Sequence, residues 1–195
     1  TRMLALGADP VVLADPGRLR YITAEGPVRE PERKHLAGIL DELDPTLVVI
    51  DGVGAALARD GLDENSARDT GTWYEGTVRP LARLGSAVLT IDQTQRNTDT
   101  RTRGGRGSWQ KLYLTDLSYS IRLTKAFSRT QSGQLKVVCE KDRTGAYAIG
   151  EAAAFVDIEP HAGGEHIEVN VRSPETQLPT VLMGYLPDDG GPQDA

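Results

Sequence analysis

The fold of this chain is decided by residues 47–52, which read LVVIDG. Four apolar residues in a row, without alternation, are typical of a strand buried on both faces, as in a parallel sheet covered by helices. A second run of this kind, AVLTI, covers residues 87–91. Between the two runs, residues 64–84 favour a helix that Pro80 should kink or divide. This alternation predicts an α/β protein with parallel strands.

Further elements are predicted on both sides of this unit. Pro31 is a favourable first residue for a helix, and apolar residues recur at helical spacing up to Leu43, before Asp44 and Pro45 end it. Residues 1–20 are expected to be irregular, and residues 20–23 are compatible with a short strand. After the second run, strands are predicted at residues 117–123, 135–139, 147–149 and 166–171.

The composition excludes several classes of protein. The chain has 195 residues, a hydrophobic fraction of 38% and a net charge of −6, and no apolar run approaches the length of about 20 residues that spans a membrane. No signal-peptide pattern is present at the start of the sequence. The single cysteine, Cys139, excludes an internal disulfide and a zinc site built from cysteines. These features favour a cytoplasmic protein with no membrane partner, and one that is not a general polyanion binder.

Two polar segments follow the predicted parallel strands and are candidates for catalysis. An aspartate at the carboxyl end of such a strand, Asp51, points into the crevice where α/β sheets bind ligands, and it could hold Mg²⁺. Asp92 and Gln93 follow the second strand, and the glutamine could contact a terminal phosphate or orient a water. The alternatives are that Asp51 belongs to an ordinary strand-ending turn and that Gln93 only begins a polar loop.

A basic loop and a pair of cations complete the set of candidate residues. Residues 93–111 contain a single acid, Asp99, and this local charge suits contact with a nucleic-acid backbone, although a merely solvated loop remains the alternative. Lys141 and Arg143 follow residues 135–139, and arginine suits the charge on a transferring phosphoryl group. The alternative for this pair is a charged hairpin end. The basic residues of the loop are Arg96, Arg101, Arg103, Arg106 and Lys111.

The order of these motifs resembles the RecA-like core of the DnaB/RepA-type hexameric helicase superfamily, and in particular phage and actinobacterial AAA-type replication ATPases. The likeness covers about residues 1–150. Residues 48–52 match the Walker B strand, and residues 91–93 match the end of the strand that follows it. The segment after the basic loop is matched by Gly107, Ser108, Lys111 and Asp116, and the last strand end by Lys141, Arg143 and Gly145.

The resemblance implies a RecA-like three-layer sandwich, with parallel strands flanked by helices and with C-terminal antiparallel strands. Residues 1–172 would form a partial NTPase core, and residues 173–195 an extended acidic tail. The intact form would bind ATP and Mg²⁺, act on single- or double-stranded DNA and assemble into a ring or hexamer.

Roles for individual residues also follow from the resemblance. Asp51 would hold Mg²⁺ through water, Gln93 would sense the γ-phosphate, and Asp92 and Gly145 would lie at the nucleotide. Lys141 and Arg143 would reach the ATP of a neighbouring subunit. Arg101, Arg103 and Arg106 would contact DNA in a central channel.

Two features of the family are not found in this sequence. The Walker A loop and the catalytic glutamate of the family are both expected before residue 1, and the first residue is threonine rather than methionine. The chain is therefore expected to be the C-terminal portion of such an ATPase or helicase. The alternatives are a catalytically inactive module that binds nucleic acid or a partner, and a nucleotide-binding α/β protein of another family.

Overall fold

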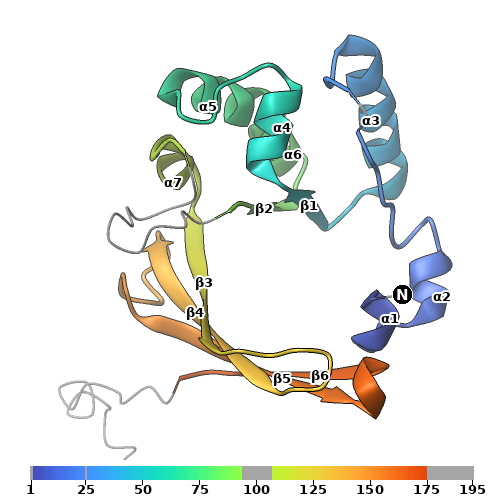
Figure 1. The fold of residues 1–195 in the computed structure, drawn as a ribbon. Coiled ribbons are helices and arrows are strands. Elements are labelled where there is room, and N and C mark those ends of the chain that lie inside the picture. The colour runs from blue at the N-terminus through green and yellow to red at the C-terminus, as the bar shows by residue number, and fades with distance from the viewer. Residues whose placement is uncertain (1, 25, 94–106, 175–195) are drawn as a thin grey trace, which may run out of the picture.

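The computed structural model describes residues 2–24, 26–93 and 107–174, which form two separate sheets with helices (Figure 1). In the smaller sheet, β1 (Leu47–Asp51) pairs in parallel with β2 (Ala87–Ile91). The larger sheet is antiparallel, in the order β3-β4-β5-β6. Its strands are β3 (Leu117–Lys125), β4 (Gly133–Asp142), β5 (Ala152–His161) and β6 (His166–Arg172). The predicted mixed α/β class, with parallel strands first and antiparallel strands last, is confirmed.

The helix predicted before the first strand is α3 (Glu30–Leu43). Proline lies in its first turn, where the missing N–H costs no hydrogen bond, and two glutamates there face the positive end of the helix dipole. The helix ends because Asp44 adopts a left-handed conformation with φ 43°, from which its N–H donates to the carbonyl of Leu40.

The helical region between β1 and β2 is divided, as predicted, but it holds more elements than the sequence indicated. A helix that was not predicted, α4 (Val53–Arg59), comes first. The rest is α5 (Ala67–Trp73), a π-helical turn (Tyr74–Val78) and α6 (Arg79–Arg83), so the irregularity lies just before Pro80. The core beside β1 is formed by Val53, Ala56, Leu57, Trp73 and Tyr74, with Ile50 packed against it.

The expectation that both parallel strands are buried on both faces is wrong. Exposure alternates along β1 and β2, and helices α4, α5 and α6 lie on one side of the strand pair (Figure 1). The other face carries Leu47, Val49, Leu89 and Ile91, whose exposed fractions are 43–53%. The apolar runs therefore place apolar side chains on both faces of the strand pair. The described residues cover only one of these two faces.

The larger sheet confirms three of the four strands predicted after β2. Residues 147–149 are instead part of a turn, because the carboxylate of Asp142 accepts a hydrogen bond from the N–H of Tyr147 and holds the chain out of the sheet. β5 was not predicted. At the other end of the chain, residues 2–20 are not irregular throughout but contain α1 (Arg2–Ala5) and α2 (Pro10–Ala14), and residues 20–23 form no strand.

Cys139 lies in the centre of β4 and should react slowly with thiol reagents. Its side chain is fully buried, its thiol lies 3.8 Å from the carbonyl oxygen of Tyr147, and burial raises the pKa of the thiol. Because the thiolate is the reactive form, we expect labelling by a chromogenic disulfide to be at least about tenfold slower in the native protein than in denaturant. Equal rates in the two conditions would contradict the burial of this strand.

Candidate functional site

The carboxyl ends of β1 and β2 meet, as the sequence predicted. Asp51 lies opposite Ile91 in the parallel register, and the N–H of Gly52 donates to the carbonyl of Ile91 at 3.2 Å. Asp92 and Gln93 directly follow, so all three predicted polar residues belong to one edge of the sheet. The Asp51 carboxylate is on the exposed face, and no group in the described residues donates a hydrogen bond to it. An exposed carboxylate without a donor is able to accept a hydrated cation.

Asp92 has a different environment, because it pairs with a buried cation. The Nζ atom of Lys111 lies 2.7 Å from Oδ2 of Asp92 and 3.7 Å from Oε2 of Glu64. The lysine side chain is 5% exposed, and the two carboxylate side chains are 18% and 21% exposed. Asp92 also accepts a hydrogen bond from the N–H of Gln93 at 2.9 Å. This triad of Glu64, Asp92 and Lys111 fixes the chain at the edge of β2.

The triad bears on the role of Lys111, which was predicted to contact nucleic acid. Its ammonium faces two carboxylates inside the protein, so the geometry favours a structural role for this residue. Glu64 was not predicted at all. It lies in the segment between α4 and α5, far from Lys111 in the sequence, and a lone glutamate in a polar loop gives no signal of such a contact.

The Gly107-Ser108 pair, part of the motif that carries the resemblance, holds the end of the basic loop against the same segment. The N–H of Ser108 donates to the carbonyl of Glu64 at 2.7 Å, and Gly107 adopts φ 93°. A Cβ atom on Gly107 would lie only 2.5 Å from that carbonyl oxygen. Glycine is therefore required by close backbone approach at this position.

Lys141 and Arg143 both contact the short helix α7 (Gln110–Leu114), which carries Lys111. Lys141 donates to three backbone carbonyls at the end of this helix, those of Leu112, Tyr113 and Thr115, at 2.6–2.9 Å. Cations near the last carbonyls of a helix are favourable. Burial, and next the nearby Arg143, lowers the pKa of Lys141.

Arg143 contacts the end of α7 and the residues after it from the solvent-exposed side. Its Nη1 atom lies 2.7 Å from Oδ1 of Asp116, and its backbone N–H donates to the carbonyl of the same residue. The Arg143 side chain is 57% exposed, so this pair is open to solvent and to a partner. The two cations thus position α7, and through Lys111 they are connected to Asp92. Their predicted reach into a neighbouring subunit stays a prediction.

Gly145, predicted to lie at the nucleotide, belongs to a turn organised by Asp142. One oxygen of this carboxylate accepts hydrogen bonds from the hydroxyl and N–H of Thr144 and from the N–H of Gly145. The hydrogen bond from the Thr144 hydroxyl is the main cause that lowers the pKa of Asp142, and the backbone N–H groups add to it.

The Asp142 turn predicts a dependence of stability on pH. Because the folded pKa is lower than the unfolded one, the carboxylate stabilises the fold above about pH 4, and this contribution is lost as the pH falls through the folded value. We expect Asp142→Asn to lower the urea midpoint at pH 7. The difference in urea midpoint between this variant and the wild type should become smaller towards pH 3. The control is Asp41→Asn on the exposed side of α3. A difference in urea midpoint that stays constant with pH would contradict the stabilising role of the Asp142 carboxylate.

Several predicted features have no counterpart in the described structure. Arg96, Arg101, Arg103 and Arg106 of the basic loop lie outside the described residues, as do residues 175–195 of the predicted acidic tail. Among the described residues, cavities of about 350 and 570 Å³ lie beside α3, and neither of these is lined by Asp51, Asp92 or Gln93. In the described part of the chain no helix is both long and apolar enough to cross a membrane.

Comparison with known proteins does not identify a family. No protein-family model matches the chain, and no curated protein gives a significant match. The class that the fold defines is thus a mixed α/β protein with a parallel strand pair, a carboxylate at the end of that pair and an antiparallel sheet. Any function rests on this geometry and on the order of the motifs.

Proposed function

We propose that this chain is part of a RecA-like ATPase core that acts on DNA. The observation that carries the proposal is the parallel register of β1 and β2, which brings Asp51 to the same edge as Asp92 and Gln93. Ligands of α/β sheets bind beyond the carboxyl ends of the strands. The exposed carboxylate of Asp51 fits a hydrated Mg²⁺, whose chemistry would be to neutralise the phosphates of ATP.

The surroundings of this edge support the same proposal. A three-layer sandwich covers both faces of its sheet, and the apolar side chains on the open face of β1 and β2 are suited to such a cover. Lys141 and Arg143 contact α7, α7 carries Lys111, and Lys111 pairs with Asp92. A change at this strand end could therefore reach the edge of the parallel pair through a continuous series of contacts. Gln93, at the end of that series, is the proposed sensor of the γ-phosphate.

Hydrolysis of ATP tests the proposal. With the native protein as expressed from its own gene, we expect ATPase activity that needs Mg²⁺ and rises with single-stranded DNA. Asp51→Asn should lower the rate by at least about tenfold, since removal of an electrostatic contact to the transferring group typically has an effect of this size or larger. Asp41→Asn is the control and should leave the rate unchanged. Hydrolysis that is insensitive to Asp51→Asn would contradict the role of this residue.

The basic loop favours a second candidate, an inactive module that binds nucleic acid or a partner. In that case DNA binding needs no ATP and weakens steeply with salt. Replacing Arg101, Arg103 and Arg106 with glutamine should reduce the slope of log affinity against log salt, by about 0.7 for each lost phosphate contact with single strands. Fluorescence anisotropy at several salt concentrations measures this. An unchanged slope would show that the loop is only solvated.

A further inference from the structure

A group of histidine and glutamate side chains lies at the tip of the β5–β6 hairpin, at the end of the larger sheet opposite to α7. The hairpin connects β5 and β6 through a 3₁₀ turn (Ala162–Gly164). In the register of the two strands, Glu159 lies opposite Glu168, and His161 lies opposite His166. Residues two apart on a strand share a face, and so do opposite residues. Two glutamates and two histidines therefore occupy the four corners of one patch.

The register places two carboxylates opposite each other in this patch. Like charges directly opposite one another destabilise a strand pair, and Glu159 and Glu168 are such a pair. The two imidazole rings stack on each other, with ring centroids 6.0 Å apart. A positive ion between the two strands would remove the repulsion.

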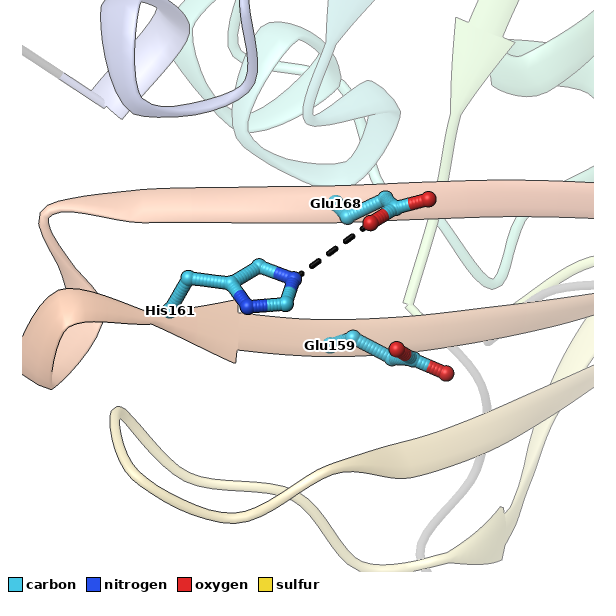
Figure 2. Close-up of side chains that lie close together, drawn as sticks. All are labelled: Glu159, His161 and Glu168. Carbon is cyan, nitrogen blue, oxygen red and sulfur yellow. Dashed lines mark ion pairs between the residues drawn. The ribbon is translucent and has the colours of Figure 1, made fainter.

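Three of the four side chains are already close enough to share an ion. The ligand atoms of Glu159, His161 and Glu168 all lie within 4.8 Å of one another. Nε2 of His161 is 3.3 Å from Oε2 of Glu168. Figure 2 shows the imidazole of His161 reaching across from β5 to the carboxylate of Glu168, with Glu159 beside it. Two zinc ligands with bonds of about 2.0 Å are about 3.3 Å apart in a tetrahedron, and the distance between His161 and Glu168 matches one edge of such a site.

We propose that Glu159, His161 and Glu168 bind a divalent transition-metal ion of the Zn²⁺ type. One imidazole nitrogen with carboxylate oxygens is a donor set that zinc accepts, whereas Mg²⁺ and Ca²⁺ prefer oxygen ligands alone. All three side chains are exposed, so the fourth position is open to water, and small rotations bring the remaining distances into range. The ion would hold the tip of the hairpin, and it is independent of the edge at Asp51.

Nuclear magnetic resonance of the imidazoles tests this directly, because the chain has three histidines. With the full chain and ZnCl₂, we expect the ring signals of His161 to shift while those of His35, on α3, stay in place. Calorimetry should give one Zn²⁺ per chain. His161→Ala and Glu168→Gln should each weaken binding at least about tenfold, which is the lower range for losing a group that supports a metal site. Because both residues are exposed, these variants are expected to fold, and circular dichroism checks this.

Matched variants serve as controls for Zn²⁺ binding elsewhere on the protein. His35→Ala and Glu165→Gln, the latter beside the hairpin turn, should bind Zn²⁺ as wild type does. Mg²⁺ should not displace the bound Zn²⁺. The proposal is overturned if the His161 signals do not move with Zn²⁺, if His35→Ala abolishes binding instead, or if His161→Ala and Glu168→Gln bind with unchanged affinity.

Discussion

Replacing Lys111 with methionine should lower the free energy of unfolding by about 3 kcal/mol. The ammonium is almost fully buried between the carboxylates of Asp92 and Glu64, and its removal leaves two partly buried negative charges facing each other. Breaking a buried ion pair by removing one partner typically costs about 3–5 kcal/mol, and the partial exposure of both carboxylates places this case at the lower end. Urea denaturation measures the change.

Two further variants show whether the loss of the Lys111 charge causes the loss of stability. Lys34→Met, on the exposed side of α3, removes the same charge from a solvated position and should change stability by less than about 0.5 kcal/mol. Combining Lys111→Met with Asp92→Asn and Glu64→Gln also removes the two negative charges that face Lys111 in the wild type. This combination should restore a large part of the free energy of unfolding that Lys111→Met loses. If the combined variant is less stable than Lys111→Met alone, the account of this triad is wrong.

Gly107→Ala should destabilise the protein by a similar amount, about 3 kcal/mol. The left-handed φ of 93° costs an alanine about 1–2 kcal/mol, and the added Cβ would lie 2.5 Å from the carbonyl oxygen of Glu64. That contact forces the backbone apart and weakens the hydrogen bond that Ser108 donates to the same carbonyl. The melting temperature and the urea midpoint both report the change.

Gly145→Ala separates the cost of the positive φ from the cost of the steric contact. Gly145 also has a positive φ, of 77°, but no atom lies within 4 Å of the position of its added Cβ. This variant should therefore lose only the conformational part, about 1 kcal/mol. Equal losses at the two glycines would mean that the close approach of Gly107 to Glu64 does not contribute.

The sequence predicted the elements whose signals are local. Apolar runs identified β1 and β2, helical spacing identified α3, and the strands predicted at 117–123 and 135–139 are β3 and β4. The strand proposed at 147–149 failed because a single carboxylate, that of Asp142, organises a turn there through hydrogen bonds that no pattern of apolar residues reveals. β5 was missed because Asp157, Glu159 and Pro160 have low strand propensity, and pairing with β4 and β6 overrides it.

The candidate site was predictable only in part. Asp51, Asp92 and Gln93 could be placed on one edge because parallel strands end on the same side of a sheet. The partner of Lys111 could not be predicted, since both Glu64 and Asp92 reach it by contacts distant in sequence. The histidines at residues 161 and 166 showed no familiar ligand spacing, because their relation arises from the cross-strand register rather than from spacing along the chain.

The most direct measurement of the central claim is an experimental structure of the native protein with Mn²⁺ in place of Mg²⁺ and a non-hydrolysable ATP analogue. We predict an anomalous manganese signal beside the Asp51 carboxylate, which contacts the ion directly or through one water, and a terminal phosphate on the side of Gln93. A nucleotide bound elsewhere, or a metal and phosphates that leave Asp51 without contact, would contradict it.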